Sequence, residues 1–172
     1  MIVTIVSHKN QEVVQEAANE SKMPVYPMLE IRISLEEFIK NKLHALQALD
    51  ILILDLSVFT DDAEHFIQAL KSLRVVYPSV QIILYAPEYK PGSYLLSQAF
   101  KLGIYDIITT NGEDAKRKIR RSLEVGMAEE EARIFEKVIE DCLEEEKEKG
   151  KLTHLFRTFK KSKKTKTLEE NI

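Results

Sequence analysis

The segment Asp50-Ile51-Leu52-Ile53-Leu54-Asp55-Leu56-Ser57 carries the strongest structural signal in the sequence. Its unbroken apolar run, 51–54, is far too short to cross a membrane and is typical of a strand buried on both faces of a parallel sheet. An acid, Asp55, ends the run, and Thr60-Asp61-Asp62 then predicts the start of a helix. Open α/β sheets bind ligands at the carboxyl ends of their strands, so we expect any functional site to lie around Asp55.

Strand and helix patterns alternate along the rest of residues 1–126. Apolar or β-branched runs predict further strands at 2–6, 25–29, 80–85 and 104–109. Apolar residues at helical spacing predict helices at 13–18, 35–49, 63–73, 93–102 and 113–126. Ser34 and Glu37 form a capping box at the second helix, and Gly103 stands where a left-handed cap closes the fourth. This alternation with short connections implies an α/β domain whose parallel sheet is covered on both faces.

Composition is that of one globular domain with an appendage. Of the 172 residues, 44% are hydrophobic, which suffices for a buried core. No window approaches eighteen apolar residues and no basic-then-apolar signal opens the chain, so we expect a cytoplasmic protein without a membrane span. The lone Cys142 cannot form an internal disulfide, and no cysteine and histidine cluster has metal-ligand spacing. We therefore expect no metal site.

Charge divides the chain into three regions. Residues 1–126 are nearly balanced, residues 127–149 hold ten acids and four bases, and residues 151–166 hold seven bases and no acid. We expect residues 127–150 to form an acidic amphipathic helix. Its apolar stripe consists of Met127, Ile134, Phe135, Val138, Ile139, Cys142 and Leu143. Such a stripe needs a partner, which is this domain, a second copy or another protein.

Residues 151–172 are predicted to be a basic flexible tail or linker. Four apolar residues are interleaved with its bases, namely Leu152, Leu155, Phe156 and Phe159. The bases are candidates for binding a polyanion, either an anionic membrane or a nucleic acid: Lys151, Arg157, Lys160, Lys161, Lys163, Lys164 and Lys166. A solvated tether and a contact with the acidic helix of a neighbouring molecule are the alternatives.

Residues 1 to about 125 resemble the receiver domain of response regulators. The resemblance rests on the segment 50–56, the strand at 82–86, the helix ending in Ala99-Phe100-Lys101-Leu102-Gly103, and the strand Tyr105-Asp106-Ile107-Ile108-Thr109, all in matching order. It implies a flavodoxin-like, doubly wound sheet of five parallel strands in the order 2-1-3-4-5. It also puts Asp55 where receivers carry the aspartate that accepts a phosphoryl group.

The positions that assist this aspartate in receivers hold other residues here. Receivers have an acidic pair after the first strand that holds Mg²⁺, whereas this chain has Ser7 and His8. Tyr85 replaces the hydroxyl residue after the fourth strand, and Thr110 replaces the lysine after the fifth. Phosphoryl transfer depends on positioning and charge neutralisation, so we interpret Asp55 as a helix cap or a relic. The alternative is an atypical phosphorylated regulator that uses Asp55.

Degenerate receivers of this kind resemble the N-terminal domains of ATPases of the partitioning and septum-placement type, including ones that localise pilus-assembly machinery. That resemblance implies a non-catalytic pseudo-receiver, a regulatory module whose partner is an ATPase domain in cis or in trans. The present sequence has no Gly-x-x-x-x-Gly-Lys-Ser/Thr loop of its own for nucleotide phosphates.

We also expect the chain to associate with a second copy of itself. It would use either the acidic helix or the face made by residues 93–126, where Tyr94, Phe100 and Tyr105 are the available aromatic residues.

Enzyme signatures are missing from the sequence. Ser7-His8-Lys9-Asn10 offers only one hydroxyl for a flavin phosphate, and Asp-x-His-x-x-Gly and Gly-x-Ser-x-Gly patterns are lacking. We expect no enzyme, no cofactor and no small-molecule substrate.

Overall fold

The structure is a computed structural model that describes residues 1–29 and 32–147. Its centre is a five-stranded sheet in the order β2-β1-β3-β4-β5 with every neighbouring pair parallel, which confirms the predicted α/β fold and strand order. The strands are β1 Ile2–Val6, β2 Val25–Leu29, β3 Ile51–Asp55, β4 Gln81–Tyr85 and β5 Asp106–Ile108. The central β3 strand is buried along its whole length, as expected for an apolar run between two helical layers.

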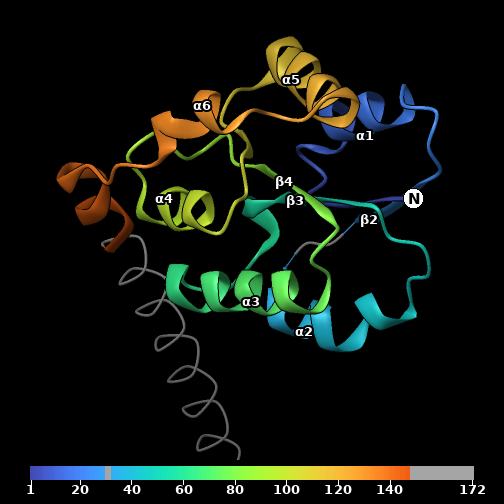
Figure 1. The fold of residues 1–172 in the computed structure, drawn as a ribbon, viewed down its shortest axis with the longest axis horizontal. Coiled ribbons are helices and arrows are strands. Elements are labelled where there is room, and N and C mark those ends of the chain that lie inside the picture. The colour runs from blue at the N-terminus through green and yellow to red at the C-terminus, as the bar shows by residue number, and fades with distance from the viewer. Residues whose placement is uncertain (30–31, 148–172) are drawn as a thin grey trace, which may run out of the picture.

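Helices cover both faces of the sheet (Figure 1). Helices α1 and α5 lie on one face and α2, α3 and α4 on the other. Their bounds are α1 Gln11–Asn19, α2 Leu35–Asn41, α3 Ala63–Val76, α4 Tyr94–Lys101, α5 Gly112–Glu124 and α6 Glu129–Ala132. Three short 3₁₀ helices add η1 Leu43–Ala45, η2 Leu56–Val58 and η3 Arg133–Phe135.

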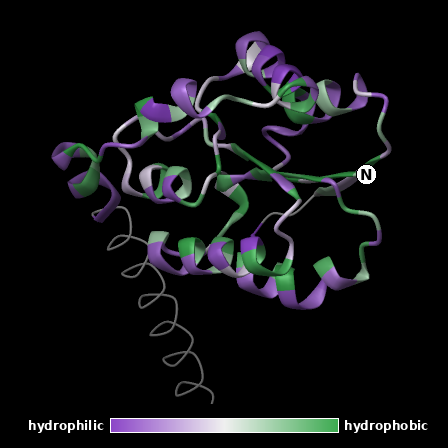
Figure 2. Ribbon diagram, in the orientation of Figure 1, coloured by the Kyte–Doolittle hydropathy of each residue, from purple (hydrophilic) through white to green (hydrophobic). Residues whose placement is uncertain are grey.

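Side-chain alternation along the strands divides the interior into two apolar clusters. In β3, Leu52 and Leu54 join the larger cluster beneath α2, α3 and α4, whereas Ile51 and Ile53 join the smaller cluster beneath α1 and α5. The strands are accordingly mostly hydrophobic, while the helices carry hydrophilic residues along much of their length (Figure 2). Burying each such Leu or Ile stabilises the fold by about 1.5–3 kcal/mol.

Most helix boundaries follow local signals, but the second helix is shorter than predicted. Ser34 caps α2, Asp62 caps α3, and Gly103 follows α4 with φ of 76°. Helix α2 ends at Asn41 instead of continuing to residue 49. The chain then tightens into η1 and reaches Ala48, whose φ of 59° ends any helical path before β3.

The predicted continuous helix is wrong over residues 127–147, and residues 148–150 of that prediction lie outside the described residues. Residues 127–147, which we call the strap, contain α6, then η3, then four non-helical residues at 136–139, and helix again from 140 to 147. The interruption lets the strap follow the domain surface beside α4 (Figure 1). Ala132 and Phe135 are buried in the larger apolar cluster, so part of the predicted stripe packs on this domain.

The start of the strap is fixed by β5. Gly126 has φ of 79° and turns the chain after α5. Asp106, 8% exposed at the start of β5, accepts hydrogen bonds from the backbone N–H of Met127 at 2.7 Å and from Gln81 Nε2 at 2.9 Å.

Two further expectations from the sequence concern the basic tail and membrane insertion. The basic segment 151–172, with all of its candidate polyanion-binding residues, lies outside the described residues. In the described part of the chain, none of the helices has the length and apolar character needed to span a membrane.

Candidate functional site

The candidate site is the carboxyl edge of the sheet around Asp55. Asp55 is the last residue of β3, and its side chain is completely buried. The β1–β3 register pairs Ile5 with Leu54, so the chain leaving β1 passes directly beside Asp55. Sheet pairing therefore brings the segment after β1 to this carboxylate.

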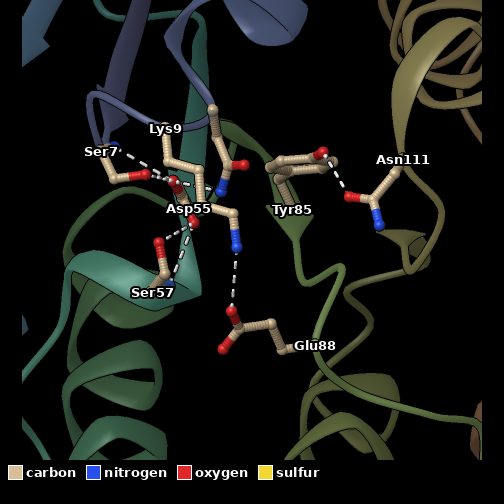
Figure 3. Close-up of polar contacts among 8 residues, drawn as sticks. Ser7, Lys9, Asp55, Ser57, Tyr85, Glu88 and Asn111 are labelled. Atoms are coloured by element: carbon tan, nitrogen blue, oxygen red, sulfur yellow. Dashed lines mark hydrogen bonds and ion pairs between the residues drawn. The ribbon is translucent and has the colours of Figure 1, made fainter.

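Five hydrogen bonds surround the Asp55 carboxylate (Figure 3). Oδ2 accepts from the Ser7 backbone N–H at 3.0 Å, from Ser7 Oγ at 2.8 Å and from Asn10 Nδ2 at 2.9 Å. Oδ1 accepts from the Ser57 backbone N–H at 3.0 Å and from Ser57 Oγ at 2.7 Å. Both oxygens are thus engaged by neutral donors, which is how a buried charge is made tolerable without a cation.

The donors come from the turns that follow β3 and β1. Ser57 lies in η2, and Asp55 caps that short helix by accepting from the Ser57 N–H. Asn10 occupies the position before α1, yet its side chain does not cap α1. Instead its side-chain amide donates to the Asp55 carboxylate, and Asn10 as a residue is only 6% exposed.

An ion pair lies at the rim of the site. Lys9 Nζ is 3.5 Å from Glu88 Oε1, and both side chains are mostly exposed, at 79% and 63%. Figure 3 shows the Lys9 side chain passing over Asp55 towards Glu88. A pair this exposed contributes little to stability, so Lys9 and Glu88 border the site without holding it together.

Tyr85 fills the next position along the edge. It is 1% exposed, and its hydroxyl donates to Asn111 Oδ1 at 3.3 Å. Burial, and then the nearby charge of Asp55, raises the pKa of the Tyr85 phenol. The phenol therefore stays neutral and ties β4 to the start of α5.

The sequence-predicted positions are only partly assembled by the fold. Ser7 donates to Asp55, and Tyr85 lies near enough to feel its charge. His8, by contrast, is exposed and lines an open hollow of about 520 Å³ along α1. Thr110 is half-buried after β5, and the five hydrogen bonds to Asp55 described above do not involve it.

Sequence reasoning missed Asn10 and Ser57. Ser57 follows Asp55 by two residues, the spacing of a local Asx turn, and this signal could have identified it. Asn10 offered no comparable signal because it lies 45 residues from Asp55 in the chain. Within residues 1–29 and 32–147, no group of three or more His, Cys, Asp or Glu side chains is arranged to hold a metal ion.

The sheet order and its two helical layers define a receiver-like domain. Its fold matches RcsB, a response regulator of Salmonella typhimurium, with a TM-score of 0.55 and 21% identity over 81% of this chain and 71% of that one. The isolated receiver domain of RcsB from Salmonella enterica serovar Typhimurium, in the presence of phosphomimetic BeF₃⁻, gives a TM-score of 0.54 and 24% identity over 72% of this chain and 85% of that one.

A third match is RcsB from the same serovar bound to the promoter P1flhDC, with a TM-score of 0.56 and 23% identity over 78% of this chain and 65% of that one. At these identities the likeness establishes the fold. No protein-family model matches the sequence, and no curated protein matches it.

Proposed function

We propose that this chain is a non-enzymatic regulatory module of the cytoplasm that acts by binding a protein. In this proposal Asp55 is a structural residue and the domain is a pseudo-receiver. We further propose, from the sequence resemblance, that the protein partner is a partitioning-type ATPase domain in cis or in trans.

The carrying observation is the engagement of both Asp55 oxygens. A phosphoryl acceptor needs a free oxygen in line with the donor, together with positive charge to neutralise the transferred group. Here Ser7, Asn10 and Ser57 occupy both oxygens, and the side chain has no exposed surface. Phosphorylation would require several of these hydrogen bonds to break.

Within residues 1–29 and 32–147, no cluster of acids is arranged to hold a metal ion beside Asp55, which supports the same proposal. Mg²⁺ prefers several oxygen ligands, usually with one or two carboxylates among them. Ser7 and His8 stand where receivers carry acids, and Ser7 already donates to Asp55. The remaining carboxylate at the rim, Glu88, faces Lys9.

Incubation of the full chain with Mg²⁺ and acetyl phosphate tests the proposal. We expect no phosphorylated species by intact mass, and no change in amide NMR shifts on addition of beryllofluoride. Asp55→Asn is the informative variant, and Asp61→Asn, which alters another acid near the same edge of the sheet, is its control. A saturable modification or shift that Asp61→Asn retains and Asp55→Asn abolishes would establish the alternative, an atypical phosphorylated regulator.

A further inference from the structure

The strap combines a strong helical sequence with an interrupted structure. No glycine or proline occurs between residues 127 and 147, and Glu, Lys, Arg and Ala dominate the segment. Nevertheless the backbone leaves the helical path at 136–139. Local preference and tertiary packing therefore disagree at one place, and such a conflict marks an element with a competing conformation.

Helix α4 and the turn before it form hydrogen bonds with the backbone groups that the break in the strap leaves without helical partners. In a continuous α-helix the Ile139 N–H would donate to the Phe135 carbonyl, and the Glu136 carbonyl would accept from residue 140. In the structure the Ile139 N–H donates to the Gly92 carbonyl at 2.9 Å instead. Ser97 Oγ, buried in α4, donates to the Glu136 carbonyl at 2.6 Å. Both groups are satisfied by the domain and not by the strap itself.

Apolar contacts hold the strap at two further points. Phe135 is 3% exposed within the larger cluster. The Ile139 side chain lies directly on Gly92, where a Cβ atom would stand only 2.6 Å from Ile139 Cγ1. Ser93, which caps α4, donates to the Glu146 carboxylate near the end of the strap. Ile139 nevertheless remains 52% exposed and Ile134 61% exposed, so Phe135 is the buried anchor of these three.

We propose that the strap is a two-state element. In the docked state it is broken at 136–139 and lies on α4. In the released state it forms one continuous helix over residues 129–147, in which Phe135, Ile139 and Cys142 share a face at i, i+4 and i+7. A helix of this length extends about 28 Å, so release would carry residue 147 away from the N-terminus of α4. The switch would thereby reposition whatever the chain carries after the strap, and it does not depend on the function proposed above.

Two glycine variants of the full chain separate docking from backbone strain. Gly92→Ala and Gly103→Ala both put a side chain on a residue with positive φ, at 104° and 76°. Only Gly92→Ala meets the strap, since nothing lies within 4 Å of a Cβ at Gly103. We expect Gly92→Ala to convert residues 133–139 to uninterrupted helical Cα chemical shifts. The thiol of Cys142, the single cysteine of the chain, should also react with a thiol reagent several times faster. Gly103→Ala should retain the wild-type strap shifts and thiol rate.

Ser97→Ala provides a test free of backbone strain. It removes the donor to the Glu136 carbonyl without adding volume, so we expect the same changes at smaller amplitude. If Gly92→Ala fails to fold, judged by loss of the shifts of the sheet, Ser97→Ala decides alone. Coil-like shifts at 133–139 in a released strap would overturn the proposal, as would wild-type strap shifts in both Gly92→Ala and Ser97→Ala.

Discussion

The Asp55 edge and the strap are held to the same domain by opposite means. Around Asp55, five hydrogen bonds from Ser7, Asn10 and Ser57 join the turns after β1 and β3, and the local cap of η2 by Asp55 agrees with the fold. The strap is held by the buried side chains of Ala132 and Phe135 and by a few hydrogen bonds to α4 and the turn before it, against its own helical preference. In the strap, by contrast, the helical preference of the sequence conflicts with the packing on α4.

This difference indicates where the molecule is rigid and where it opens. Breaking the Asp55 cluster leaves the buried Asn10 amide and the part-buried Ser7 donors without their acceptor, which is costly at the edge of the sheet. Releasing the strap exposes Ala132 and Phe135, but its freed backbone groups pair with each other in a helix. Segments with few buried contacts open at lower free energy than the core. We therefore expect the two regions to respond differently to substitution.

Asp55→Ala should give the largest loss of stability. It leaves the buried Asn10 amide and the part-buried donors of Ser7 and Ser57 without their acceptor, and we expect the free energy of unfolding to fall by about 3 kcal/mol. Urea denaturation followed by circular dichroism measures this change. The control is Asp50→Ala at the other end of the same strand, where the exposed carboxylate should cost no more than about 0.5 kcal/mol. Equal losses in the two variants would show that Asp55 is not a structural centre.

Phe135→Ala should have a smaller and local effect. Losing this buried ring removes the main apolar anchor of the strap, and we expect stability to fall by about 2 kcal/mol. Amide hydrogen exchange should quicken in the strap and α4 while β1 and β3 keep their protection. Ile134→Ala changes an exposed neighbour on the same strap and should stay within about 0.5 kcal/mol of wild type. Loss of protection throughout the sheet would mean that the strap belongs to the core and is not a separate unit.

Local sequence patterns were sufficient for the strands and several helix ends. The β2 strand was predicted at 25–29 and is found at Val25–Leu29, in spite of Pro27, because it is an edge strand that pairs only with β1. The cap at Asp62 was also predictable, since a cap signal is contained within four residues. These features depend on near neighbours in the chain.

The site and the strap depended on distant contacts that no local pattern contains. Asn10 reaches Asp55 only because β1 and β3 pair in one particular register. The helix break at 136–139 requires Gly92 and Ser97, which lie about forty residues earlier in the chain. Of the predicted apolar stripe, Phe135 is buried, whereas Ile134, Val138 and Ile139 are exposed, and a continuous helix was the wrong backbone for the segment. Packing on α4 overrode propensity there.

Asp62 is an N-cap exposed to solvent, in contrast to the buried Asp55. Substituting Asp62 should have the smallest effect of the variants considered. It accepts from the His65 N–H at 2.8 Å, and its two oxygens each lie 2.7 Å from His65 Nδ1. The hydrogen bond to Asp62, and then the charge of Asp62, raises the pKa of His65 above its ordinary value of about 6.5. A raised folded-state pKa means that this contribution to stability is complete below about pH 6.5 and is lost as the pH rises through the folded-state pKa.

Asp62→Asn keeps a capping oxygen but removes the charge, so the pKa of His65 should fall towards 6.5. An NMR titration of the His65 ring measures this fall, and salt should reduce the wild-type shift because both side chains are largely exposed. Glu64→Gln removes the adjacent carboxylate, which is not among the groups that shift His65, and should leave its pKa unchanged. An equal fall in both variants would attribute the shift to the general acidity of this surface and not to the cap. A fall confined to Asp62→Asn would show that an exposed capping acid acts on one partner, whereas the buried Asp55 holds together two turns of the sheet edge.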